Sequence, residues 1–279
     1  MKGISITIPK LSDPRFIFLM FTFCFLGYIL FLPGYGRSAS EYLFLMSLCL
    51  FFDFFLRGIM DGKWVFPLSG LVSAFGLFMI CDVSSPIYYI PMAILAMGSK
   101  FFIKIKSRHI FNPTTFGVVF TSLAFPSAVS PTGLLRWDGN LFMSLFIFIC
   151  GLLMVIKVNR WAVSASYYLT AVAVATPLSF FIHENPYTYL HSLMWEGIVV
   201  YTFFNLTDPK TSPHKLKYQL LYGASIAVLT QFFRTFDMRL PEHKALLIAC
   251  FLYAAIDIYI RDKEKIEVWK VREVSIGGR

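Results

Sequence analysis

The sequence predicts an all-α polytopic membrane protein with about ten transmembrane helices. Of its 279 residues, 57% are hydrophobic and only 15% are charged, whereas about 25% of the residues in a typical soluble protein are charged. Apolar runs long enough to cross a bilayer recur from residue 15 to residue 260. Two proline-broken polar stretches lie at the rims of such runs. Irregular backbone at membrane depth survives only where protein buries it or where it lines a cavity.

The expected spans follow one another with short connections. They cover residues 15–33, 41–57, 64–82, 86–104, 109–126, 140–157, 161–182, 188–206, 218–235 and 243–261. No signal-peptide pattern precedes the first span. We therefore expect a cytoplasmic N-terminus (1–14), one transmembrane domain (15–261, with halves 15–126 and 140–261) and a charged cytoplasmic tail (262–279). Because each half would hold an odd number of spans, the halves would be inverted repeats with broken helices.

The positive charges predict the orientation of these spans. With the N-terminus inside, all but five of the 25 Lys and Arg residues fall on the cytoplasmic side. The exceptions are Arg37, Arg136, Arg234, Arg239 and Lys244. The net charge of +9 is thus a topology signal rather than a sign of nucleic-acid binding, and it places both termini on the cytoplasmic side. We expect the membrane to be a bacterial inner membrane.

Two polar strings interrupt the apolar pattern. One is His109-Ile-Phe-Asn-Pro-Thr-Thr-Phe-Gly117, and the other is Phe203-Phe-Asn-Leu-Thr-Asp-Pro-Lys-Thr-Ser-Pro213. Both contain Asn or Asp before Pro, which suits a helix N-cap followed by a proline at the first helical position. The surrounding basic residues are explained either by loop solvation or by cations and helix N-termini that cradle an anionic or heteroaromatic ligand.

The third expected span carries a row of small residues, namely Ser69, Gly70, Ser73, Ala74 and Gly76. Small residues let helices approach closely. The row therefore indicates either tight helix packing or a surface against which a planar ring system inserts.

Acidic residues inside spans are costly and mark candidate functional sites. Asp53 has Arg57 one helical turn away, so an ion pair explains it without a function. Asp257 lies near the inner end of the last span. Glu196 lies well inside the eighth span with no basic residue within a turn, which makes it a candidate proton or cation site.

Other kinds of site are disfavoured. The five histidines lie in loops or at span ends, so paired axial ligands for a haem inside the membrane are not expected. The five cysteines form no C-x-x-C pair and are best explained as small buried hydrophobic residues. No zinc motif, phosphate-binding loop or nucleophile elbow is present in the sequence.

These strings and their flanks resemble the NqrB/RnfD family. This family comprises the membrane flavin subunits of the sodium-translocating NADH:quinone reductase and of the Rnf electron-transport complexes. The similarity is ordered along most of the chain. It includes the small residues from Ser69 to Gly76, Met97-Gly-Ser-Lys100, Phe111-Asn-Pro113, Leu206-Thr-Asp-Pro209 with Thr211, Tyr222-Gly223, Arg234-Thr235 and Asp257.

The resemblance implies two inverted five-helix halves, flavin-mediated electron transfer coupled to sodium or proton movement, and membrane or cytoplasmic redox subunits as partners. It implies a cytoplasmic flavin-binding cluster of Asn112, Thr114, Thr115, Asp208, Lys210 and Thr211, with Ser69 and Ser73 lining a slot. Glu196 is then expected to accept a coupled proton or cation.

One departure concerns covalent flavin. Family members with covalent FMN attach it through a threonine in an extended external stretch, which is reduced here to residues 126–140. We therefore expect a noncovalent flavin (riboflavin or FMN), no haem and no metal. Two alternatives remain open: a small-solute or ion transporter of the same fold without a redox centre, and a membrane scaffold that recruits a cytoplasmic partner through its basic rim.

Overall fold

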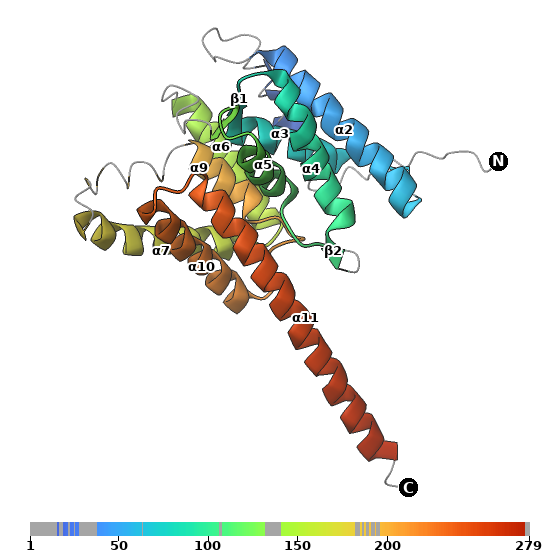
Figure 1. Cartoon of the computed structure of the whole chain (residues 1–279). Coiled ribbons are helices and arrows are strands. Elements are labelled where there is room, and N and C mark those ends of the chain that lie inside the picture. The colour runs from blue at the N-terminus through green and yellow to red at the C-terminus, as the bar shows by residue number, and fades with distance from the viewer. Residues whose placement is uncertain are drawn as a thin grey trace, which may run out of the picture.

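The computed structural model describes most of the chain. It covers residues 16, 19–21, 23, 24, 26, 27, 38–62, 64–105, 108–131, 141–181, 185, 187, 190, 193 and 196–276. Helices dominate these residues, which confirms the predicted all-α class (Figure 1). Most of the first expected span and the loop 132–140 lie outside the described residues.

The described helices of the first half are α2 (Ala39–Asp61), α3 (Leu68–Ile80), α4 (Tyr89–Phe102) and α5 (Pro113–Ala124), with a 3-10 turn η1 (Pro86–Tyr88) before α4. Helix α2 packs against both α3 and α4, and α4 packs against α5. A Cβ atom at Gly70 would lie 2.9 Å from the Cys49 carbonyl oxygen of α2. The small-residue row of α3 thus permits a close helix approach, which is the packing role predicted for it.

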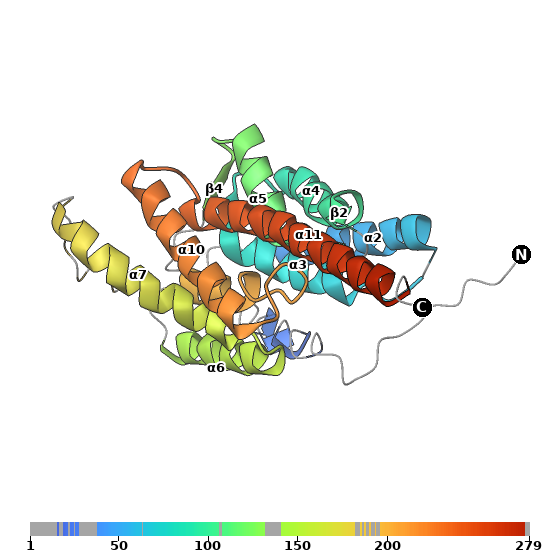
Figure 2. The same ribbon diagram turned by 90° about the horizontal axis from the view of Figure 1, so that it is seen from below.

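The second half contains α6 (Leu141–Lys157), α7 (Trp161–Phe181), α9 (Glu196–Val200), a π-helical turn η2 (Tyr201–Asn205), α10 (Leu216–Thr235) and α11 (Pro241–Ile276). Helix α10 lies along α7 and α11, as Figure 2 shows from below. Helix α11 extends well beyond the helical body. It includes most of the segment that was expected to be a separate charged tail, because its helix continues to Ile276.

Two short antiparallel ribbons connect helices, and the sequence did not predict them. Strand β1 (Cys81–Val83) pairs with β4 (Val129–Pro131), and β2 (Lys104–Ile105) pairs with β3 (Arg108–His109). Each ribbon joins loops that the charge pattern places on one side of the membrane. The ribbons give the ends of α3, α4 and α5 backbone hydrogen-bond partners outside the helices.

Among the described helices, α2 alone has both the length and the apolar composition to cross a membrane. Three shorter apolar helices are Leu68–Ile80, Pro113–Ala124 and Leu145–Lys157. The described helices overlap the second to tenth expected spans, the eighth only from residue 196 onward. Ten crossings and an inverted repeat stay a prediction.

Two hydrophobic cores lie side by side. One combines first-half residues such as Tyr42 and Phe78 with Ile147 and Phe203 of the second half, whereas the buried residues of the other, such as Tyr167, all come from the second half. Phe111, from the first polar string, packs against the second core, and α5 contacts α11. The first polar string therefore lies where the two halves meet.

Candidate functional site

The first polar string begins helix α5 as its sequence predicts. Asn112 is the N-cap, and its Oδ1 accepts a hydrogen bond from the Thr115 backbone N–H at 3.1 Å. Pro113 occupies the first helical position, where its missing N–H costs nothing. The Asn112 Nδ2 donates to the Asn205 carbonyl at 3.3 Å. One side chain thus starts α5 and connects it to the π-helical turn η2.

The second polar string does not begin a helix. The Asp208 Oδ1 accepts from the Lys210 N–H at 2.9 Å, and the Asp208 carbonyl accepts from the N–H groups of Thr211 and Ser212. The chain therefore turns after Asp208, and α10 starts only at Leu216. Pro213 explains the difference, because it cannot donate a helical hydrogen bond and disfavours helical geometry in the residue before it. The expectation of one helix-start chemistry in both strings was wrong for this one.

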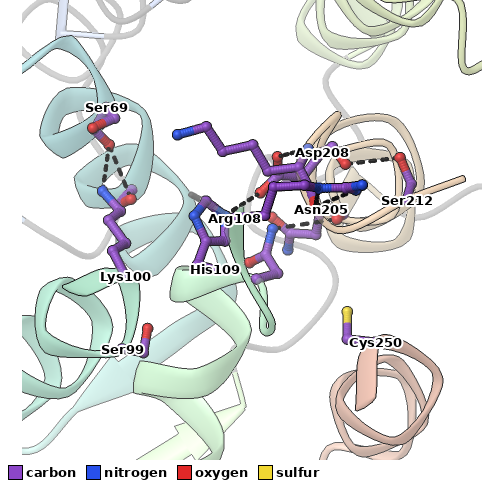
Figure 3. Close-up of polar contacts among 12 residues, drawn as sticks. Ser69, Ser99, Lys100, Arg108, His109, Asn205, Asp208, Ser212 and Cys250 are labelled. Atoms are coloured by element: carbon purple, nitrogen blue, oxygen red, sulfur yellow. Dashed lines mark hydrogen bonds and ion pairs between the residues drawn. The ribbon is translucent and has the colours of Figure 1, made fainter. Parts of the chain in front are cut away.

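The two strings lie against each other, as Figure 3 shows. The His109 Nε2 lies 3.3 Å from the Asp208 Oδ2. Arg108 donates twice to the Lys210 carbonyl, from Nε at 3.0 Å and from Nη2 at 2.7 Å. Its Nη1 also lies 3.9 Å from the Asp257 Oδ2 of α11. Strand β3 thus positions two consecutive side chains that fasten the Asp208 turn.

The Asp208 carboxyl is held in its charged form. Burial acts to raise its pKa, but the hydrogen bond and charge of His109 and the backbone N–H of Lys210 outweigh burial and hold the pKa below its usual value. A carboxylate at this position keeps both acceptor oxygens available for the turn and for His109.

Arg160 also binds the Asp208 turn. The sequence analysis identified this residue only as one of the cytoplasmic charges. It is 2% exposed. Its Nε donates to the Ser212 Oγ at 3.0 Å, its Nη1 donates to the carbonyls of Val158 and Asn159, and its Nη2 lies 2.6 Å from the His214 Nδ1. The turn therefore lies between two cationic side chains, Arg108 and Arg160.

Several buried polar atoms at this junction have no hydrogen-bond partner among the described residues. They are Thr115 Oγ1, Asn205 Nδ2 and Thr211 Oγ1. Most buried side-chain polar atoms in proteins are hydrogen-bonded. Cys250 of α11 lies at the edge of the junction, where its thiol is 3.2 Å from the Tyr222 hydroxyl. The junction of the two strings, meaning residues 108–115, 205–212 and Cys250, is called the polar junction below.

The remaining predicted site residues lie elsewhere or are satisfied locally. Thr114 packs against α3, where a Cβ atom at Gly76 would lie 2.9 Å from the Thr114 Cγ2. The Ser69 hydroxyl donates to the Asp53 Oδ2 at 2.8 Å, and the Ser73 hydroxyl donates to the Ser69 carbonyl at 3.0 Å. Glu196 is the first residue of α9, and its side chain lies outside the described part of the structure.

The predicted pair of Asp53 and Arg57 is confirmed, with Nη2 and Oδ1 3.4 Å apart. Lys100 of α4 also faces this carboxylate at 3.5 Å. No pattern in the sequence indicates this second cation, which is distant along the chain.

Comparison with known proteins shows a similarity to one family. Residues 132–265 match the model of the NQR2, RnfD, RnfE family. The matched region contains the Asp208 turn, Arg160 and Cys250, which confirms the resemblance and supports a location in the membrane.

A relative from Shewanella frigidimarina (strain NCIMB 400) is one of the subunits of an ion-translocating oxidoreductase complex. It is 30% identical over 132 residues, which are 45% of this chain and 37% of the relative. The match thus spans little more than a third of the relative's length.

Proposed function

We propose that this chain is a flavin-binding membrane subunit for transmembrane electron transfer, possessing a noncovalent flavin at the polar junction. The unpartnered buried polar atoms of Thr115, Asn205 and Thr211 carry the proposal. The name of the Shewanella relative, which describes a component of an ion-translocating oxidoreductase complex, supports a redox-linked role. It also supports further subunits of such a complex as partners.

The residues of the polar junction fit the hydrogen-bonding edge of a flavin ring. Hydroxyl groups of Thr115 and Thr211 donate and accept hydrogen bonds, and the Asn205 amide nitrogen donates. The pyrimidine edge of a flavin presents both acceptors and a donor. When bound, a flavin passes one or two electrons, and the protein tunes it through hydrogen bonds and nearby charge.

The surrounding residues orient these groups. Asn112 connects the start of α5 to the Asn205 backbone, while His109 and Asp208 fix the turn that carries Thr211. Arg108 and Arg160 add positive charge beside the turn, which favours an electron-rich ligand. Lys210 extends from the same turn, and Glu196 stays a proposed proton or cation site.

The proposed membrane arrangement is ten crossings in two inverted halves, with the polar junction at the cytoplasmic end. The contacts between loops support it. Arg108 contacts Lys210 and Arg160 contacts Ser212, all in segments assigned to the inside. Arg239 donates to the Pro126 carbonyl at 2.6 Å, and both belong to segments assigned to the outside.

The test is the visible absorption spectrum of detergent-purified protein before and after acid precipitation. Yellow colour released into the supernatant would support a noncovalent flavin. Colour that stays in the pellet would mean a covalent flavin and contradict that part of the proposal. A protein that remains colourless after incubation with riboflavin or FMN would contradict flavin binding and favour solute transport or a scaffold role.

A further inference from the structure

We propose that a second site binds a phosphate-class oxyanion at the expected cytoplasmic ends of α2, α3 and α4. It is formed by Asp53 and Arg57 of α2, Ser69 of α3 and Lys100 of α4, which we call the Asp53 cluster. None of these residues belongs to the polar junction, although the resemblance placed Ser69 in a flavin slot. The proposal therefore stands whether or not the polar junction binds a flavin.

The Asp53 cluster has an excess of positive charge. Two cations face one carboxylate, and no other described residue forms an ion pair with any of them. The Asp53 side chain is 0% exposed, the Lys100 side chain 8% and the Arg57 side chain 25%. A buried charge without a counter-charge is costly. One added anion would neutralise the cluster.

The two cations engage the carboxylate only loosely. Arg57 Nη2 and Lys100 Nζ lie 3.4 Å and 3.5 Å from Asp53 Oδ1, whereas a close charged hydrogen bond measures about 2.7–2.9 Å. Only the Ser69 hydroxyl, at 2.8 Å, makes a short contact with Asp53. Asp53 therefore does not fully satisfy the charge and hydrogen-bonding capacity of Arg57 and Lys100.

Donor groups in the cluster also remain open. The Arg57 Nε is buried and has no hydrogen-bond partner among the described residues. Lys100 directs one contact to the Met97 sulfur at 3.4 Å, and a thioether is a weak acceptor. Its other contacts are the Ser69 carbonyl at 3.2 Å and Asp53. A guanidinium fork beside an ammonium group suits the several oxygens of a phosphate group.

The same charges argue against a cation. A sodium ion or an additional proton at Asp53 would meet two positive charges against one negative charge. Although Asp53 is a buried acid in an apolar helix, its surroundings favour an anion. The partial exposure of Arg57 leaves one side through which a lipid phosphate or a dissolved phosphate can approach.

The test measures the thermal unfolding midpoint of the full chain in micelles of dodecyl maltoside, a detergent without phosphate. One arm adds sodium phosphate against sodium chloride of equal ionic strength, which controls for screening. The other arm adds phosphatidylglycerol to the micelles. Lys100→Gln removes one cation of the cluster. Lys104→Gln is the matched control, because Lys104 pairs with the exposed Asp61 at 3.2 Å outside the cluster.

The proposal expects a rise in the unfolding midpoint for the wild type and for Lys104→Gln, and an apparent affinity at least about tenfold weaker for Lys100→Gln. A rise in the midpoint with sodium phosphate would identify a dissolved oxyanion as the ligand. A rise only with phosphatidylglycerol would identify a lipid headgroup as the ligand. No rise in either arm, or an equal rise in Lys100→Gln, would overturn the proposal.

A second variant keeps the test decisive if Lys100→Gln does not fold. Asp53→Asn removes the competing carboxylate and leaves both cations, so it should bind the same probe more tightly. Unchanged or weaker binding by Asp53→Asn would overturn the proposal. Flavin content, measured on the same samples, reports separately on the polar junction and is expected to be unaffected by Lys100→Gln.

Discussion

Asn112 performs two structural tasks with the two ends of one amide. Its oxygen caps α5 by accepting from the Thr115 N–H, and its nitrogen donates to the Asn205 carbonyl in the other half of the chain. Serine or aspartate would suit the cap alone equally well. The amide is needed only because the second partner is a backbone acceptor.

Two substitutions at this position separate the tasks. Asn112→Asp keeps the cap oxygen but loses the donor to Asn205, so the unfolding free energy should fall by about 1 kcal/mol. Asn112→Ala loses both bonds and should cost about 2 kcal/mol. Denaturant unfolding in detergent measures the difference, and flavin content should fall in both variants.

Ser38→Ala is the matched control for Asn112. Ser38 caps α2 by accepting from the Glu41 N–H at 3.2 Å, far along the chain from the polar junction. Its loss should cost about 1 kcal/mol and leave flavin content unchanged. Equal stability of the aspartate and alanine variants of Asn112 would contradict the division into two tasks.

The lowered pKa of Asp208 should make the free energy of unfolding depend on pH under acid conditions. Its pKa in the folded protein lies below the ordinary 3.8, so the unfolded chain takes up its proton first as the pH falls. The stabilisation is fully present well above pH 4 and is lost as the pH drops through the folded pKa. Asp208→Asn keeps an acceptor for the Lys210 N–H but removes this titration.

Unfolding midpoints measured from pH 6 to pH 3 test this prediction. The wild type should lose stability more steeply below about pH 4 than Asp208→Asn, by at most about 1.4 kcal/mol per pH unit for one group. Asp61→Asn removes an acid from the exposed pair with Lys104 and serves as the control. If stability fell with pH as steeply in Asp208→Asn as in the wild type, the predicted contribution of Asp208 would be wrong.

At the scale of elements, the contact of α7 with α10 depends on one glycine. A Cβ atom at Gly223 would clash with the Ser166 Oγ and with the Val163 carbonyl oxygen. The Val163 carbonyl belongs to the backbone and cannot move aside as a flexible side chain can. Gly223→Ala should therefore force α7 and α10 apart. We expect a loss of about 2–3 kcal/mol, measured by denaturant unfolding.

Gly98→Ala in α4 provides the opposite expectation. The nearest atom to a Cβ there belongs to the Phe102 ring at 3.6 Å, an ordinary contact. Alanine should therefore be tolerated and can stabilise the helix by up to about 1 kcal/mol. If the two alanine variants lost equal stability, the close approach at Gly223 would not be the cause.

The elements show which features the sequence could predict. Apolar runs located the helices well, and the pattern Asn112-Pro113 correctly indicated an N-cap. The similar pattern at Asp208-Pro209 misled, because Pro213 interrupts the helix that Pro209 could have begun. The second cation at Asp53 could not be predicted, since Lys100 approaches it only through the packing of α2 against α4.

At the scale of the whole molecule, the contacts between charged loop residues lie at two ends. The ion pair of Lys104 with Asp61 and the bonds of Arg108 and Arg160 to the Asp208 turn lie at one end. The pair of Arg234 with Glu242 and the bond of Arg239 to Pro126 join segments assigned to the other. The basic residues are concentrated at the first end, which the positive-inside rule assigns to the cytoplasm.

Cysteine labelling in intact cells tests this orientation. A membrane-impermeant thiol reagent should label Arg239→Cys directly but label Lys104→Cys only after the cells are permeabilised. The unsubstituted chain reports the background from its native cysteines, of which Cys24 is exposed. Because both replaced side chains lie on exposed loops or their rims, a buried thiol would not explain a missing signal. Labelling of Lys104→Cys in intact cells, with Arg239→Cys protected, would reverse the orientation and move the polar junction to the outer face.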